Sequence, residues 1–253
     1  MAALPVTPMP VPPAGEPPLS EGARIIDTFI APRKTFNDLR RNASWWAPWL
    51  LIAVVTLIFV YVMGRQIGFD QITKNSIVQS SRAEQFEKLP PDQQAKQIQL
   101  ATTIARYVSY SIPIVQLISL VVIAGVLMAA FNFGAGAGVS FKIAMAIVVY
   151  SCLPGIVSAA LGIVSMFAGV DPAGFNAQNP VATNPAHFMD PAGNKFLYGL
   201  ASAFDVFIIW SIVLIGIGFA CNSKVKRSTA ITIVAGLYLL YKLVASGFGA
   251  AFS

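Results

Sequence analysis

Two charged residues, Asp205 and Lys242, lie inside long apolar stretches and are the first candidates for chemistry. Asp205 is the single acid in ASAFDVFIIWSIVLIGIGFAC (201–221), and Lys242 is the single charged residue in TAITIVAGLYLLYKLVASGFGAAF (229–252). An ionised side chain at the centre of a bilayer costs about 3 kcal/mol on insertion scales. Each residue is therefore a candidate for a functional site, for an ion pair or for a helix end.

The two apolar stretches are joined by the short turn NSKVKRS (222–228), which predicts two antiparallel neighbouring helices. Asp205 precedes Asn222 by 17 residues, and Lys242 follows Ser228 by 14 residues. At about 1.5 Å per residue, the two charges lie about 25 Å and about 21 Å from the turn. Because the lysine stem is flexible, it can cover the difference. The spacing predicts a salt bridge or close polar pair between Asp205 and Lys242, near the outer third of the membrane.

A second interpretation gives Asp205 a structural role at a helix start. Ser202-Ala-Phe-Asp205 fits a helix-start box, in which an acid in the first turn meets the positive end of the helix dipole. A helix over 202–221 would also match one bilayer thickness. We prefer packing or capping to the other open alternative, in which Asp205 carries a proton or an ion.

The remaining reactive residue types form no recognisable site. His187 is the only histidine, without HExxH spacing, and the serines in the apolar stretches have no intramembrane His or Lys at the depth of a catalytic dyad, with Lys242 left open as the one exception. Cys152 and Cys221 lie in apolar stretches without CxxC spacing, which is typical of packing residues. GAGAG (134–138) lacks the Lys-Ser/Thr of a phosphate loop. We therefore expect a protein that is not an enzyme, with no catalytic residue, metal site or cofactor.

The composition is that of a membrane protein that crosses the bilayer several times. Of the 253 residues, 56% are hydrophobic and 11% are charged, whereas soluble domains carry about 25% charged residues. A helix needs about 20 apolar residues to cross the hydrocarbon core. The predicted fold is therefore an all-α polytopic integral membrane protein with five transmembrane helices, at about 45–64, 107–131, 141–169, 202–221 and 229–252.

Two prolines are predicted to kink these spans, Pro113 in the second and Pro154 in the third. Kinked spans, together with Gln116 and Asp205, leave open a small-solute or ion permeation path. Transporters of that kind are built from paired repeats, however, and five spans without internal symmetry do not divide that way. We expect Gln116 to face a neighbouring helix.

Three regions surround the spans within the membrane domain 45–252. The proline-rich residues 1–22 predict a disordered tail. Residues 23–44 form an amphipathic segment that lies either in the headgroup layer or against the protein's own cytosolic face. Residues 65–106 predict an extracytoplasmic helical loop, with a break at Leu89-Pro90-Pro91 and a second helix that continues into the second span.

Lysines and arginines predict the orientation, since cytoplasmic loops carry an excess of them. Nine basic residues would be cytoplasmic if the N-terminus is inside: Arg24, Arg33, Lys34, Arg40, Arg41, Lys142, Lys224, Lys226 and Arg227. On the other side, the third-to-fourth loop holds only Lys195. The long loop between the first and second spans carries six basic residues but also four acids, so it counts less as evidence for the orientation. We expect a cytoplasmic N-terminus and a C-terminus outside.

Because the basic residues flank the spans, the net charge of +6 does not indicate a nucleic-acid partner.

Several short motifs together resemble one family. FIAPRKTF, WWAPWLL, LPPDQQ, YSCLPGIV and DVFIIWSIVLIGIGF are similar to patterns of the prokaryotic branch of the Yip (Ypt/Rab-interacting protein) family, over about residues 22–250. The resemblance implies five spans and a cytosolic N-terminus, and it supplies no catalytic residues. Eukaryotic relatives bind prenylated small GTPases. The DLYGP-like and GYG patterns associated with that activity are absent here, so small GTPase binding is not expected.

The predicted function is that of a membrane-organising or partner-binding scaffold in a bacterial inner membrane. Its expected partners are the lipid bilayer and further copies of the chain or other membrane proteins. The segments GIGF (216–219) and SGFGAAF (246–252) contain small residues that permit close helix approach and hence oligomers. The alternative is the permeation protein that uses the second and third spans and Asp205.

Overall fold

The computed structural model describes residues 17–80 and 83–251, and within these ranges the chain forms helices and no strands. Of the predicted disordered tail, residues 1–16 lie outside the described part. The elements in chain order are α1 (Glu21–Ile30), α2 (Pro32–Asp38), α3 (Trp46–Gln66), α4 (Phe69–Val78), α5 (Ala83–Glu87), α6 (Pro91–Ala135), α7 (Phe141–Ser151), α8 (Pro154–Phe167), η1 (Pro185–Phe188), α9 (Lys195–Ala201), η2 (Ser202–Phe204), α10 (Val206–Cys221) and α11 (Arg227–Ala251).

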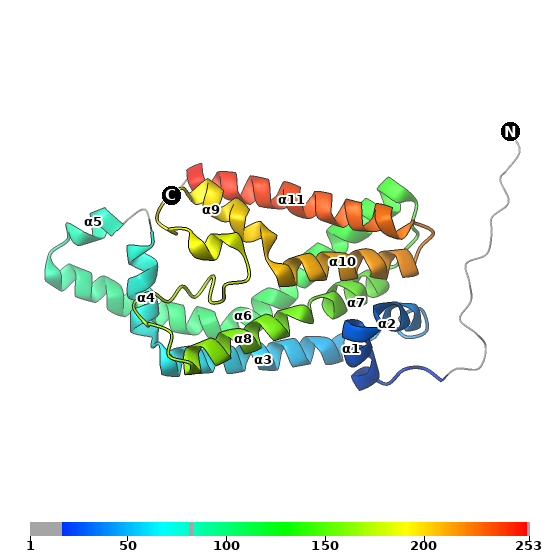
Figure 1. The fold of residues 1–253 in the computed structure, drawn as a ribbon, viewed down its shortest axis with the longest axis horizontal. Coiled ribbons are helices and arrows are strands. Elements are labelled where there is room, and N and C mark those ends of the chain that lie inside the picture. Colours follow the sequence, from blue (N-terminus) through cyan, green and yellow to red (C-terminus); the bar gives the residue numbers. More distant parts are fainter. Residues whose placement is uncertain (1–16, 81–82, 252–253) are drawn as a thin grey trace, which may run out of the picture.

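The long helices run along one axis and form an elongated bundle (Figure 1). The short helices α1 and α2 lie at one end of this bundle, whereas α4, α5 and the start of α6 lie at the other (Figure 1). The last turns of α11 lie at the end away from α1 and α2 (Figure 1). The first and last described helices therefore leave the bundle at opposite ends.

The prediction of an all-α protein with membrane-spanning helices is confirmed. Four helical stretches are long and apolar enough to cross a bilayer: Trp46–Gln66, Pro91–Ala135, Phe141–Phe167 and Arg227–Ala250. A fifth candidate is bent, because Lys195–Phe204 and Val206–Cys221 meet at 56°. Asp205 lies at this bend, so the fourth predicted span consists of a regular helix, α10, preceded by a differently directed piece.

Both spans continue past the prolines that were predicted to kink them, and the kinks themselves stay predictions. Pro113 is buried inside α6, which continues as helix on both sides of it. At Pro154 the helix is broken over two residues, Cys152 and Leu153, and α8 begins at the proline itself. Proline is tolerated there because the first residues of a helix have no intrahelical partner for their N–H groups. α7 and α8 together still form one candidate span.

α7 lies at the centre of the bundle, with every side chain from Ala144 to Ser151 buried. Phe131 of α6 stacks on Phe219 of α10 with ring centroids 4.0 Å apart. By contrast, α6 and α11 expose many large apolar side chains, such as Ile114 at 65% and Leu240 at 59%. Such surface suits a helix whose outer face is solvated by lipid rather than by water.

The amphipathic segment folds as the helices α1 and α2 and packs against the bundle. Phe36 is fully buried, and its carbonyl accepts a 2.9 Å hydrogen bond from Asn222 Nδ2 beyond the end of α10. Arg24 is 1% exposed, and its guanidinium forms a 2.7 Å ion pair with Asp38. Burial alone would lower the pKa of Arg24. The hydrogen bond and the negative charge of Asp38 outweigh this effect and hold the pKa above its ordinary value. The segment therefore contacts the bundle, and whether its outer face also lies in the headgroup layer stays a prediction.

The same helix α1 turns apolar side chains outward. Ile26 is 61% exposed and Ile30 is 75% exposed, while the polar residues Arg24 and Thr28 are buried. The hydroxyl of Thr28 donates to the Arg24 carbonyl at 2.7 Å, so this buried polar side is satisfied internally. Packing against the protein therefore leaves the isoleucines free to contact lipid.

The loop between the first two spans is helical, as predicted. α6 begins at Pro91 and continues for 45 residues from the loop into the span. The stretch before the break differs from the prediction of one helix, since it forms α4 and α5. α4 is tied to the next loop, because Asn75 Nδ2 donates to the carbonyls of Pro172 and Phe175 at 2.8 and 2.9 Å.

Candidate functional site

The carboxylate of Asp205 caps α10. Its Oδ1 accepts hydrogen bonds from the backbone N–H groups of Phe207 at 2.9 Å and Ile208 at 3.2 Å. An aspartate in this position satisfies N–H groups that have no partner within the helix and places negative charge at the positive end of its dipole. The expected capping role is therefore present. The N-cap is Asp205 itself and not Ser202, so the helix begins later than the predicted box.

The other carboxylate oxygen of Asp205 holds the loop before α9. Oδ2 accepts from the Thr183 hydroxyl and from Asn184 Nδ2, the latter at 3.3 Å. The Val206 N–H also donates to the Thr183 carbonyl at 3.1 Å. Asn184 is further linked to Asn179 by amide-to-amide hydrogen bonds in both directions. One carboxylate therefore joins the bend in the fourth span to the polar loop that covers it.

Lys242 has a hydrogen-bond partner other than Asp205. Its ammonium donates to Ser202 Oγ at 2.9 Å, and that hydroxyl donates in turn to the Gly199 carbonyl at 2.8 Å. Within the described ranges the ion pairs do not join Lys242 to Asp205. Both residues nevertheless line the same cavity. Their electrostatic pairing across it stays a prediction.

This cavity has a volume of about 590 Å³ and lies among α6, α8, α10 and α11 beneath the loop. Its polar lining includes Gln116, Ser158, Ser211, Asn179, Asn184, Tyr198, Asp205 and Lys242. The Gln116 side chain faces this cavity, and its buried Oε1 has no hydrogen-bond partner in the described part. A cavity of this lining could hold water or a small polar solute.

The loop partners of Asp205 were not predicted from the sequence. Thr183 and Asn184 lie in a stretch of Asn-Pro and Asp-Pro turns that predicts irregular structure but no particular contact. The asparagines themselves were the only available signal, because Asn and Thr side chains are common hydrogen-bond partners in turns. Their pairing with a residue more than twenty positions away depends on how the loop folds back.

The other chemistry-bearing residues do not come together. His187 is exposed on η1, and its ring contacts Phe188 edge-to-face at 5.5 Å. Cys152 and Cys221 are both free thiols. Across the described ranges, no three side chains of His, Cys, Asp or Glu gather as a set of metal ligands.

Comparison with known protein families gives a match over most of the chain. The Yip1 domain family model matches residues 26–248, which is most of the chain. No curated protein and no solved structure matches it. The matched range begins within α1 and ends within α11, so it includes the Asp205 site and all the candidate spans except the last residues of α11. The chain therefore belongs to the Yip1 family, as the resemblance of its motifs indicated, and its apolar helices make it an integral membrane protein.

Proposed function

We propose that the protein is a non-enzymatic scaffold that organises the membrane at the surface where α1 and α2 lie. The observation that carries this proposal is the orientation of α1. Its polar residues Arg24 and Thr28 are locked into the protein, while Ile26 and Ile30 point outward with 61% and 75% exposure. An apolar helix face held at the end of a transmembrane bundle enters the boundary between headgroups and acyl chains.

The position of α1 supports this contact with lipid. α1 lies at the end of the bundle where α3 begins (Figure 1). There α3 presents Trp46, which is 58% exposed, and tryptophan is enriched at the membrane interface. The Phe29 ring also packs edge-to-face on Trp210 of α10, with centroids 5.7 Å apart. A helix anchored this firmly would displace lipid in one leaflet as a fixed wedge.

A non-enzymatic role also fits the use of the polar groups in the spans. Each oxygen of Asp205 accepts two hydrogen bonds, and Lys242 is bonded to Ser202. Groups with these partners stabilise a bend and a loop rather than a reacting substrate. Association with other membrane proteins or with further copies is part of the proposal, because α6 and α11 offer large apolar surfaces.

We further propose a bacterial inner membrane as the location, with the α1–α2 end in the cytoplasm. The nine basic residues assigned to that side support this orientation. The motifs similar to the prokaryotic branch of the family support the bacterial setting. Small GTPase binding is not part of the proposal, because the patterns associated with it are absent.

The proposal is tested by the preference of the purified protein for curved membranes. Reconstituted into a mixture of small and large vesicles, the wild-type chain should be enriched in the small ones, since a wedge in one leaflet binds better where lipids are splayed. The double substitution Ile26→Ser with Ile30→Ser should abolish this enrichment. The measurement is the protein-to-lipid ratio of each vesicle class by fluorescence.

The matched control is Val78→Ser with Phe188→Ser. These residues are also exposed apolar side chains, at 65% and 81%, but they lie on α4 and η1. The control should keep the wild-type distribution. An even distribution of the wild-type protein, or an equal loss in both double variants, would contradict the proposed role of α1.

A second candidate function is the binding or permeation of a small polar solute through the cavity beneath the loop. The specific observation in its favour is Gln116 Oε1, a buried acceptor that faces this cavity without a donor among the described residues. A solute with an N–H or O–H group would supply that donor. Solute flux in vesicles containing Asp205→Asn or Lys242→Met variants distinguishes this function from the scaffold.

A further inference from the structure

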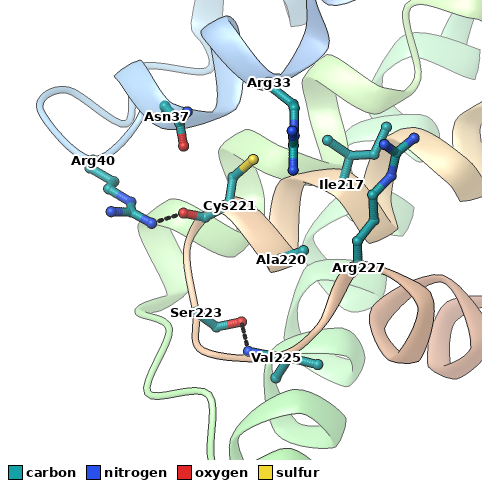
Figure 2. A pocket seen from close by; sticks show the side chains of 9 residues that line it. All are labelled: Arg33, Asn37, Arg40, Ile217, Ala220, Cys221, Ser223, Val225 and Arg227. Carbon is teal, nitrogen blue, oxygen red and sulfur yellow. Dashed lines mark hydrogen bonds between the residues drawn. The ribbon is translucent and has the colours of Figure 1, made fainter. Parts of the chain in front are cut away.

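Three arginines from separate parts of the chain meet around the end of α10. Arg33 belongs to α2, Arg40 follows α2, and Arg227 is the first residue of α11. Figure 2 shows the three guanidinium groups directed toward the C-terminal end of α10 from different sides. Between them is an open cavity of about 410 Å³, which we call the arginine pocket.

The arginine pocket has an excess of positive charge. No carboxylate of the described residues lines it. The acids of α1 and α2 are used elsewhere, because Asp38 pairs with the buried Arg24 and Asp27 pairs with Lys34. Neither Arg33 nor Arg227 forms an ion pair within the described part of the chain. Their charges therefore remain available to a ligand.

The negative end of the α10 dipole cancels this charge only in part, because donors already reach the carbonyls of Gly218, Phe219 and Cys221. Arg40 Nη2 donates to the Cys221 carbonyl (Figure 2). The Gly218 carbonyl accepts from Asn222 Nδ2 at 2.9 Å, and the Phe219 carbonyl accepts from the Ser223 hydroxyl at 2.7 Å. α11 begins at Arg227, so the positive end of that helix dipole also lies at the pocket.

The chemistry of the pocket matches a phosphate group at a membrane surface. Arginine presents planar N–H groups that bind two phosphate oxygens at once. The rest of the lining is partly apolar and includes Ile217, Ala220 and Val225. The pocket lies where α10 ends and α11 begins, which is the level at which a span leaves the hydrocarbon and meets headgroups.

We propose that the arginine pocket binds the phosphate group of an anionic phospholipid. Arg33 and Arg227 hold the phosphate oxygens, Arg40 keeps the end of α10 capped, and the apolar lining contacts the glycerol and upper acyl chain. Basic pockets between transmembrane helices are known to select anionic headgroups in this way. Phosphate lies at both membrane surfaces, so this inference does not depend on the proposed orientation or on the role of α1.

The test is retention of lipid by the purified full-length chain in neutral detergent, measured by native mass spectrometry. Wild-type protein should retain phosphatidylglycerol in preference to phosphatidylcholine. Arg33→Gln with Arg227→Gln should weaken phosphatidylglycerol binding by about tenfold or more, since each basic side chain near an anionic lipid contributes to its binding. Arg33→Lys with Arg227→Lys should give an intermediate loss, because it keeps the charge but not the planar N–H groups.

The matched control is Lys224→Gln with Lys226→Gln. Like the arginine-to-glutamine variant, it removes two positive charges, but it removes them from the turn between α10 and α11. Neither lysine lines the pocket. The control should bind phosphatidylglycerol as the wild type does, and thermal unfolding should show that all variants are folded. Equal losses in both glutamine variants, or no loss in either, would overturn the proposal.

A separate titration with inorganic phosphate distinguishes a lipid from a soluble ligand. If the pocket serves a lipid, phosphate should compete weakly with phosphatidylglycerol, because it lacks the glycerol and acyl contacts. Tight binding of inorganic phosphate that depends on Arg33 and Arg227, without retention of phosphatidylglycerol, would identify a soluble phosphate as the ligand and overturn the lipid assignment.

Discussion

A carboxylate in an apolar run can be structural when both of its oxygens accept hydrogen bonds from the protein itself. Asp205 satisfies this condition, because one oxygen caps α10 and the other holds Thr183 and Asn184. These hydrogen bonds satisfy both carboxylate oxygens and reduce the cost of placing the group at the edge of the membrane. At the scale of the residue, Asp205 fixes the start of α10 and holds the loop that contains Thr183 and Asn184 against it.

Substitution of Asp205 should separate its capping role from its charge. Asp205→Ala removes all four acceptor interactions and should lower the free energy of unfolding by about 1–3 kcal/mol. Asp205→Asn keeps an oxygen that accepts from Phe207 and Ile208, so its effect should be smaller. Thermal or denaturant unfolding in detergent measures both. Equal effects of the two substitutions would show that the charge, and not the cap, is what stabilises the protein.

The same residues discriminate the predicted pair from the permeation function. If Asp205 and Lys242 interact across the cavity, then Asp205→Asn combined with Lys242→Met should restore the protein level that either single change lowers. If the cavity conducts a solute, the single variants should instead reach normal levels and lose flux in vesicles. We expect restoration of the protein level without a measurable flux in the wild type.

At the scale of the element, glycines determine how closely the last two long helices pack. A Cβ built on Gly216 of α10 would lie 2.8 Å from the Ile231 Cα and 2.9 Å from its backbone nitrogen in α11. A Cβ on Gly218 would meet Ile147 and Phe36 instead. The small residues of the GIGF segment are therefore used within one chain. Gly247 and Gly249 have open space at the Cβ position and leave the second predicted segment available for a neighbour.

Gly216→Ala should destabilise the protein because the backbone of Ile231 cannot move aside as a side chain would. The expected loss in the free energy of unfolding is about 1–3 kcal/mol. Gly236→Ala in α11 is the matched control, since its Cβ would meet no atom within 4 Å. Alanine also favours helix over glycine, so the control should be neutral or slightly stabilising. Unfolding midpoints in detergent compare the two, and an equal response would contradict the close packing.

At the scale of the whole molecule, the bundle separates two chemically different ends. One end carries α1, α2 and the arginine pocket, and the other carries α4, α5 and the polar loop over the cavity (Figure 1). Lipid-facing helices connect them. In the proposed arrangement, the end with the arginine pocket is basic and binds lipid at one membrane surface, and the end with α4 and α5 lies at the other surface.

The orientation can be measured by labelling single cysteines in intact cells. In a chain with Cys152→Ala and Cys221→Ala, Phe188→Cys should react with a membrane-impermeant maleimide, because it lies on the side predicted to face outward. Lys224→Cys should react only after the cells are permeabilised. Both positions are exposed in the structure, so burial does not explain a difference. The opposite pattern would reverse the orientation.

The sequence by itself determined the class of the protein and the approximate places of its spans, because a bilayer imposes length and apolarity on each helix separately. Charge counts along the chain and short motifs are also read from the sequence alone, and they led to a predicted orientation and to the family. The start of α6 at Pro91 was also predictable, because proline disfavours helix in the residue before it and is tolerated in the first turn of a helix.

The tertiary structure alone decided which distant groups meet. No local pattern pairs Thr183 with Asp205, because that contact depends on how the loop before α9 folds back. None brings Arg33 and Arg227 to one cavity either, because that depends on how α2 and α11 meet at the end of α10. The apolar residues of α1 were visible in the sequence, but not that the helix buries Arg24 and exposes Ile26 and Ile30. A helix has several sides, and only its packing partners determine which of them remains for lipid.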